Sequence, residues 1–275
     1  MARRLFACFG RGSSSSNSGN EISSDNAAAT ADLTAEEQRR GGPVVLELFS
    51  SQGCATSTEA ELLFSRIGIR GEFNLEVPVI LLAYHVDYWD YKGWKDTFGS
   101  SQWTVRQKAY VEALNLDTMF TPQVVVQGKA HCVGNEPDAL LSSIQSALRV
   151  PAPTLQATFQ RPSVESLQVS ITGALRTKVD HQGADIMVAL YENGLVTDCQ
   201  KGENAGRVIP NDFVVRKLEK LCFVKDISAK KTISGTVTFP LWDGFNSSKC
   251  GVAVFVQNSS HQIFGSQNFK LPENI

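Results

Sequence analysis

One cysteine in this sequence stands where the chain can make it reactive. Cys54 follows an apolar run that begins at Val44 and a small turn, and it comes just before a segment with helical periodicity at residues 58–67. At the start of a helix, unpaired backbone N–H groups and the positive end of the helix dipole stabilise a thiolate. The thiolate is the form that attacks disulfides and peroxides. The position therefore predicts sulfur chemistry at Cys54.

The residue three positions later limits that chemistry. Dithiol oxidoreductases carry a second cysteine there, whereas this chain has Ser57, so no disulfide can form within the motif. What remains is monothiol chemistry, in which Cys54 forms a mixed disulfide with glutathione or a protein and a second thiol releases it. Ser57 is expected to donate a hydrogen bond to the thiolate. Cys132 is either a resolving thiol or, the favoured alternative, a small core side chain, and an iron–sulfur cluster on Cys54 is a weaker alternative.

Two polar residues follow the next apolar run, at residues 77–84. This run is typical of a strand buried on both faces of a parallel sheet, joined to the first strand by a right-handed crossover. His85 and Asp87 then lie at the sheet edge that carries Cys54, where sites on open α/β sheets form. Either they tune the thiol's pKa or relay a proton, or they form a hydrogen-bonded pair that anchors the next loop.

Two further groups of residues could contribute to binding. Aromatic side chains are dense at residues 88–94, where Trp89 and Asp90 could line a groove for a peptide or small ligand. The favoured alternative is that the aromatic residues pack the loop and the following helix against the second domain. A charged segment at residues 201–207 contains Glu203, Asn204 and Arg207. A structural loop, with Arg207 paired to an acidic partner across a domain interface, is favoured there over direct catalysis.

The order of elements predicts an α/β fold in two domains after an N-terminal tail. Residues 1–42 are polar and low in complexity, which predicts a disordered tail. Residues 43–150 show the order βαβαββα of a thioredoxin-like domain, with Thr121-Pro122 opening a hairpin. After the Pro-rich linker, residues 151–275 alternate between polar and apolar residues, which predicts an antiparallel β-sandwich.

Composition excludes several classes of function. With a net charge of −2 there is no electrostatic case for nucleic acid, and no apolar run reaches the roughly 20 residues of a membrane span. The six cysteines form no Cys-x-x-Cys pair and do not cluster with histidines, so neither disulfides nor a metal or other bound cofactor is expected. The cytoplasm is the favoured compartment, and an organelle (chloroplast or mitochondrion) is the alternative suggested by arginine and serine residues near the N-terminus.

Several separate blocks resemble one family. The chain resembles the DUF1223 family of thioredoxin-like proteins over about residues 43–270, and its blocks are Leu46–Cys54, His85–Asp90, Arg106-Gln107, Tyr110, Thr121-Pro122 and Gly202–Arg207. Bacterial members usually carry Cys-x-x-Cys. This chain has Cys-Ala-Thr-Ser, the form shared by plant members.

The resemblance implies a site and two candidate functions. In thioredoxin-like proteins a proline, usually cis, faces the reactive cysteine and presents backbone to a substrate peptide, so Pro122 is expected to be cis and to face Cys54. The first candidate is a monothiol thiol–disulfide oxidoreductase that acts on protein thiols, with glutathione as a co-substrate. The second is a noncatalytic protein-binding module that keeps the fold.

Overall fold

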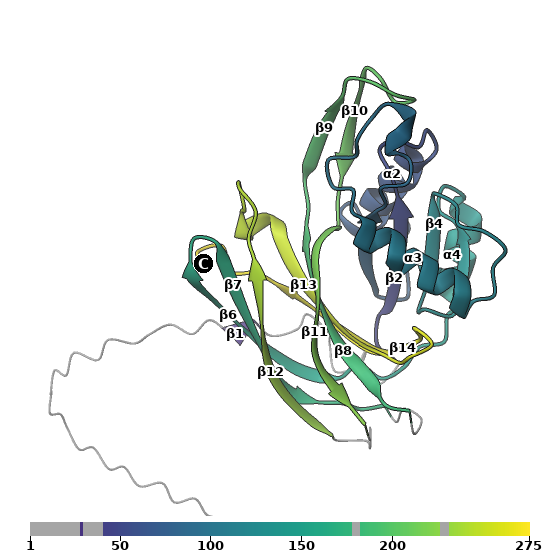
Figure 1. Ribbon diagram of the computed structural model, residues 1–275. Coiled ribbons are helices and arrows are strands. Elements are labelled where there is room, and N and C mark those ends of the chain that lie inside the picture. The colour runs from purple at the N-terminus through teal and green to yellow at the C-terminus, as the bar shows by residue number, and fades with distance from the viewer. Residues whose placement is uncertain (1–27, 30–40, 178–181, 226–230) are drawn as a thin grey trace, which may run out of the picture.

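A computed structural model describes residues 28–29, 41–177, 182–225 and 231–275. The tail expected at residues 1–42 lies outside the described residues except for positions 28–29 and 41–42. Within the described ranges, no helix is long and apolar enough to cross a membrane. Figure 1 shows a mixed α/β molecule that consists mostly of sheet, with its helices gathered near one end.

The first half of the chain alternates strands and helices in the order expected from its periodicity. The elements are β2 (Val44–Ser50), α2 (Ser57–Gly68), β3 (Val79–His85), the short 3-10 helix η1 (Asp90–Lys92), α3 (Ser101–Ala113), β4 (Gln123–Val126), β5 (Ala130–Val133) and α4 (Pro137–Ser146). Strand β2 pairs in parallel with β3 and antiparallel with β4. Both β2 and β3 are almost wholly buried, which explains why they read as continuous apolar runs.

The second half is made of strands. They are β6 (Thr154–Ser163), β7 (Ser166–Ala174), β8 (Ala184–Glu192), β9 (Leu195–Cys199), β10 (Arg207–Asn211), β11 (Val214–Val224), β12 (Thr232–Pro240), β13 (Cys250–Gln257) and β14 (Ile263–Lys270), with a 3-10 turn η2 (Ser247–Lys249). Strands β6, β7 and β12 form a four-stranded sheet with β1 (Ala28–Ala29). Strands β9 and β10 form a separate hairpin beside α2 (Figure 1).

One sheet runs through both halves of the chain. Its eight strands follow the order β14-β13-β8-β11-β3-β2-β4-β5. The join is a short parallel pairing in which Val214 of β11 lies opposite Ala83 of β3, and Ala83 N–H donates to the Phe213 carbonyl over 2.8 Å. The sequence pattern predicted a sandwich appended after residue 150, and this continuity with the first half was not foreseen.

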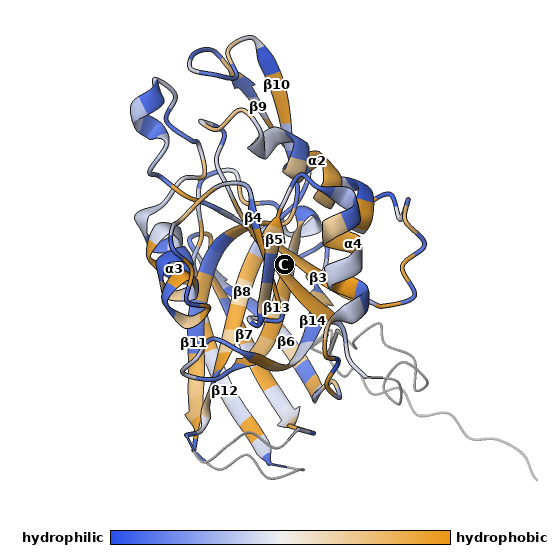
Figure 2. Ribbon diagram, turned by 90° about the vertical axis from the view of Figure 1, so that its right-hand side faces the viewer, coloured by the Kyte–Doolittle hydropathy of each residue, from blue (hydrophilic) through white to orange (hydrophobic). Residues whose placement is uncertain are grey.

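Two apolar clusters fill the molecule. The first surrounds β2 and β3 but also takes in Ala253 and Phe255 of β13 and Ile263 of β14. The second lies between the four-stranded sheet and strands β8 and β13. Figure 2 shows hydrophobic residues concentrated along the strands of the large sheet, with hydrophilic residues on α3. The first cluster therefore crosses the boundary expected near residue 150.

A buried polar network ties α3 to the large sheet. Glu47 has no exposed surface, and its Oε1 accepts from Arg106 Nε over 2.8 Å. The Tyr110 hydroxyl donates to Glu47 Oε2, and Gln257 Nε2 of β13 donates to the Tyr110 hydroxyl over 2.8 Å. Arg106 also donates to Gln257 Oε1 over 3.2 Å. The charge of Glu47 is thus matched by one cation of α3, and Gln257 of β13 contacts Glu47's two partners rather than Glu47 itself.

Candidate functional site

Cys54 lies in a tight turn between β2 and α2. Its backbone N–H donates to the Ser51 carbonyl over 3.0 Å, and the side chain is only 7% exposed. Gly53 passes against Trp89, where a Cβ atom would lie 3.1 Å from the Trp89 carbonyl oxygen. Helix α2 begins three residues after Cys54, at Ser57. The thiol therefore precedes the first turn of the helix instead of lying within it.

Hydroxyl groups surround the Cys54 thiol. Its Sγ lies 3.5 Å from Thr56 Oγ1 and donates to the Thr121 carbonyl over 3.7 Å. Burial raises the pKa of Cys54, but hydrogen bonds from the side chains of Ser57, Thr121 and Thr56 outweigh it, so that the pKa lies below its ordinary value. The Ser57 hydroxyl oxygen also accepts a hydrogen bond from Ser51 N–H over 3.3 Å. This bond holds the oxygen in place, and the hydroxyl proton remains free to be donated to the thiolate.

Thr121, which precedes Pro122, lies next to the thiol. The peptide bond between them is cis. Trp89 Nε1 donates to Thr121 Oγ1 over 2.7 Å, so the indole orients the hydroxyl that bonds the thiol. Trp89 is therefore a positioning residue for Thr121, a role that neither the groove nor the packing expected for the aromatic loop included.

His85 does not pair with Asp87, contrary to one of the two roles expected for it. Its Nδ1 lies 2.8 Å from Asp96 Oδ2 and its Nε2 lies 3.2 Å from Glu61 Oε1, and the ring is wholly buried. Burial lowers the pKa of His85, but the two carboxylates outweigh it and raise the pKa to about 10. His85 is thus a buried cation between Glu61 and Asp96.

His85 supports the backbone of the turn through Asp96. Asp96 Oδ2, which pairs with His85, also accepts from Gln52 N–H over 2.7 Å. The side chains that lower the pKa of Cys54 through hydrogen bonds are those of Ser57, Thr121 and Thr56. The pKa-tuning and proton-relay roles expected for His85 therefore stay predictions, whereas its contact with Asp96 holds the loop at residues 93–100 against the turn.

Asp87 and Asp90 serve the loop that follows β3. Asp87 Oδ1 accepts from the Thr104 hydroxyl over 2.6 Å, which ties the loop to α3. Asp90 Oδ1 accepts from Asp96 N–H over 3.1 Å, and burial together with neighbouring acidic groups raises its pKa. Neither carboxylate touches Cys54, so the tuning role expected for Asp87 and the groove role expected for Asp90 have no contact to support them.

The hairpin β9–β10 brings two further expected residues to the turn. Asn204 is buried, and its Nδ2 donates to the carbonyls of Gln52 and Cys54 over 2.9 and 3.1 Å. Glu203 Oε2 accepts from Ala55 N–H over 3.2 Å. The hairpin loop thus holds the backbone of the Cys54 turn, although it lies about 150 residues away in the chain.

Among the described residues, Arg207 bonds an amide and not the acidic partner expected for it. Its NH1 donates to Asn204 Oδ1 over 2.9 Å, within the same hairpin. Arg207 therefore orients the Asn204 amide so that its Nδ2 faces the turn. The tight turn at Gly206, whose φ is 77°, brings the arginine back onto its own loop.

Sequence reasoning missed three residues that build this site. Gln52 accepts from Trp94 Nε1 and donates to Thr197 and Asn211 of the hairpin strands β9 and β10. Asp96 and Glu61 hold His85. Only Glu61 carried a usable signal, because it is an acidic residue on the buried face of α2. Gln52 and Asp96 lie in loops, where no periodicity marks a buried side chain.

The four other thiols within the described ranges have raised pKa values, the opposite of activation. Burial raises the pKa of Cys132, whose neighbour is Ser143 on α4. All five cysteines within the described ranges are unpaired. In the same part of the chain, no group of His, Cys, Asp or Glu residues is arranged to hold a metal ion.

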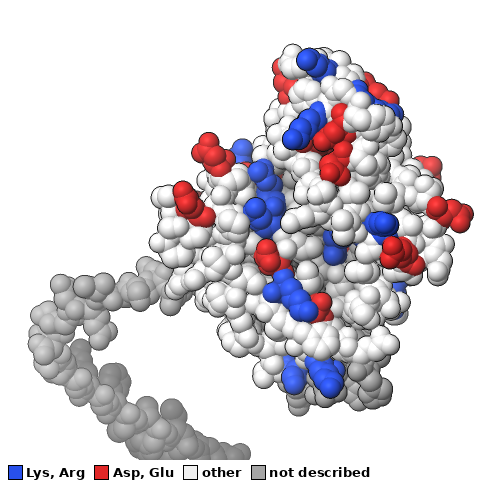
Figure 3. Space-filling view, in the orientation of Figure 1, with Lys and Arg blue, Asp and Glu red and all other residues white. Residues whose placement is uncertain are grey.

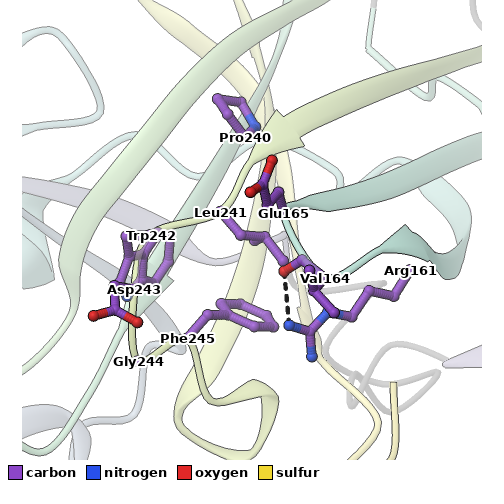
Figure 4. A pocket seen from close by; sticks show the side chains of 9 residues that line it. All are labelled: Arg161, Val164, Glu165, Pro240, Leu241, Trp242, Asp243, Gly244 and Phe245. Carbon is purple, nitrogen blue, oxygen red and sulfur yellow. Dashed lines mark hydrogen bonds between the residues drawn. The ribbon is translucent and has the colours of Figure 1, made fainter.

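A pocket of about 530 Å³ lies away from Cys54, at the turn between β6 and β7 and the segment after β12. Figure 4 shows Phe245 and Trp242 on one side of it and Arg161 on the other, with the guanidinium donating to the Val164 carbonyl. Its lining contains no thiol or histidine. Figure 3 shows acidic and basic side chains interspersed on the visible face, in line with the net charge of −2.

Comparisons with solved structures place the fold among known proteins. The chain is 26% identical to a protein from Agrobacterium tumefaciens whose crystal structure was determined as a structural genomics target, with a TM-score of 0.59 over 86% of this chain and 97% of that one. HBP35 of Porphyromonas gingivalis shares the fold at 16% identity, with a TM-score of 0.51 over 84% of this chain and 76% of the other. Among curated proteins, none matches the sequence.

The family model that matches covers most of the folded chain. It spans residues 45–257, and therefore includes β2, the Cys54 turn, the cis peptide bond and the β9–β10 hairpin. Its description is "Protein of unknown function (DUF1223)". The family expected from the sequence blocks is thus the right one, and the chain belongs to the DUF1223 family.

Proposed function

We propose that this protein is a thioredoxin-like monothiol that exchanges disulfides through Cys54. The observation that carries the proposal is the set of hydroxyl hydrogen bonds that lower the pKa of Cys54 despite its burial. The order of elements through α4 and the cis peptide bond of Thr121-Pro122 next to the thiol support a thioredoxin-like relationship. Fold alone would not suffice, because one fold serves many functions.

The chemistry is a thiol–disulfide exchange in two steps. The Cys54 thiolate attacks one sulfur of a disulfide, forms a mixed disulfide and releases the other sulfur as a thiolate. A second thiolate, supplied by glutathione or a protein, then attacks the mixed disulfide and regenerates Cys54. Ser57 stabilises the starting thiolate, and Thr121 presents its carbonyl and hydroxyl to the sulfur. The second step forms a new disulfide between the attacking sulfur and the substrate sulfur, so each step consumes one thiolate and one disulfide and forms one of each, and no outside oxidant or reductant is needed.

Exchange at Cys54 is directly testable on the full chain. The protein is treated with glutathione disulfide at pH 7, and the mixed disulfide is located by mass spectrometry of its peptides. We expect the adduct on Cys54 in the wild type and none at the motif in Cys54→Ser, because serine cannot form a disulfide. Cys132→Ser is the matched control, because the raised pKa of the Cys132 thiol disfavours its attack on a disulfide. This variant should keep the Cys54 adduct.

Two results would contradict exchange at Cys54. If Cys54 of the folded wild type stays unmodified while the exposed thiols of an unfolded sample react, the thiol is inert in its native setting. The same conclusion follows if Cys54→Ser takes up glutathione at the wild-type rate.

A noncatalytic protein-binding module is the second candidate, and one observation favours it. Only 7% of Cys54 is exposed, whereas Tyr91, stacked on Trp89, is 78% exposed. Such an aromatic pair beside the site could hold a protein partner without chemistry. In that case Tyr91→Ala would abolish capture of a partner while Cys54→Ser left it intact.

We place the protein in a reducing compartment, with the cytoplasm favoured. The unpaired state of the five cysteines in the described ranges supports this, because disulfides persist in oxidising compartments and are rare in the cytosol.

A further inference from the structure

An ion pair stands directly beside the Cys54 turn. Lys92 Nζ lies 2.6 Å from Glu203 Oε1, and the other oxygen of the same carboxylate, Oε2, accepts from the backbone N–H of Ala55 over 3.2 Å. Ala55 is the residue that follows Cys54. One carboxylate is therefore bound by an ammonium group and a backbone N–H next to the thiol.

Lys92 is held in place independently of Glu203. Its Nζ lies 4.1 Å from the centre of the Trp89 ring, a cation–π contact, and Trp89 is fixed in turn by its hydrogen bond to Thr121. The hydrogen bond to Glu203 raises the pKa of Lys92, and the negative charge of a Cys54 thiolate raises it further. Lys92 thus lies within electrostatic range of the thiolate.

The Glu203 carboxylate can move away from Lys92 and Ala55 without disturbing the Cys54 turn. It lies in the loop between β9 and β10, and its side chain is 39% exposed, with Lys92 at 28%. Exposed ion pairs of this kind contribute little to stability. The turn itself stays anchored because Asn204, the next residue, is buried and bonds the carbonyls of Gln52 and Cys54.

We propose that Lys92 and the Ala55 N–H form a subsite for a carboxylate of the substrate, which Glu203 occupies until the substrate displaces it. The inference rests on the proposed exchange at Cys54 and names its substrate class, a small disulfide or thiol with a carboxylate near its sulfur, of the kind that glutathione represents. When such a disulfide enters, its carboxylate binds Lys92, the Cys54 thiolate attacks the nearer sulfur, and the farther sulfur leaves as a thiolate.

The test compares an acidic disulfide with an uncharged one. Second-order rate constants for adduct formation at Cys54 are measured with glutathione disulfide and with bis(2-hydroxyethyl) disulfide, and their ratio is the readout. Because both probes use the same thiolate, any change in its reactivity cancels in the ratio. We expect Glu203→Gln to raise the ratio by about fivefold, the effect of one exposed charge pair, and Lys92→Gln to lower it by about as much.

Matched variants separate the subsite from net charge. Glu219→Gln in β11 and Lys108→Gln on α3 remove exposed charges of the same sign elsewhere, and both should leave the ratio unchanged. If the wild type reacts with both probes but neither Glu203→Gln nor Lys92→Gln moves the ratio, the subsite is wrong and the proposed function stands. If the wild type reacts with neither probe, the proposed function fails and the subsite fails with it.

Discussion

Arg106→Met is expected to lower the free energy of unfolding by about 3–5 kcal/mol, the usual cost of removing one partner from a buried ion pair. Glu47 has no exposed surface, and Arg106 is the cation that faces it, with NH2 2.6 Å from Oε1. Tyr110 and Gln257, its other neighbours in the network, can supply hydrogen bonds but no charge. Urea unfolding at pH 7 measures the effect.

Two companion variants make this result specific. Lys108→Met changes an exposed position on the same helix and should cost no more than about 0.5 kcal/mol. The double variant Glu47→Leu/Arg106→Met removes both charges and should recover most of the loss, since apolar replacements of buried pairs are often neutral. A loss below about 1 kcal/mol for Arg106→Met alone would show that Glu47 is not held as a buried carboxylate.

The stability of the protein is expected to fall as the pH rises from about 6.5 to about 10, through the titration of His85. Its folded pKa of about 10 lies above the ordinary value of 6.5, so the folded state binds the proton more tightly than the unfolded state. The stabilisation is therefore complete below pH 6.5 and is lost as the pH approaches 10. The slope reaches at most about 1.4 kcal/mol per pH unit.

The His85 contribution is isolated by comparing variants. The difference in unfolding free energy between the wild type and His85→Gln should shrink steadily over this pH window, because the variant lacks the cation between Glu61 and Asp96. His131→Gln, which removes an exposed imidazole, is the matched control. A difference that stays constant from pH 6.5 to 10 would mean that His85 is neutral in the folded protein.

Hydrophobic periodicity in the sequence was enough to predict the strands and helices of the first half of the fold. Two apolar runs predicted β2 and β3, and the spacing of Ala60, Leu63 and Phe64 predicted α2, because burial on a known face leaves a period in the sequence. The alternation after residue 150 predicted strands, but it could not name their partners. The pairing of Val214 with Ala83 joins segments about 130 residues apart, and no local signal encodes such a contact.

The candidate site also has a part that the sequence could predict and a part that it could not. Cys54, Ser57 and Thr121 are placed by the ends of β2, α2 and β4, so their meeting could be predicted. His85 was assigned to Asp87 because the two are close in the chain, yet the loop at residues 93–100 returns and brings Asp96 to the imidazole. The packing of that loop decides which carboxylate pairs with His85.

The measurement that bears most directly on the proposed exchange is the pKa of the Cys54 thiol in the folded full chain. The rate of alkylation by iodoacetamide is followed against pH, with mass spectrometry restricting the readout to Cys54. We expect a midpoint below the free cysteine value of about 8.5, and a rise in that midpoint in Ser57→Ala, which removes one hydrogen bond to the thiolate. A midpoint at or above about 8.5, unmoved by Ser57→Ala, would contradict a reactive thiol at this site.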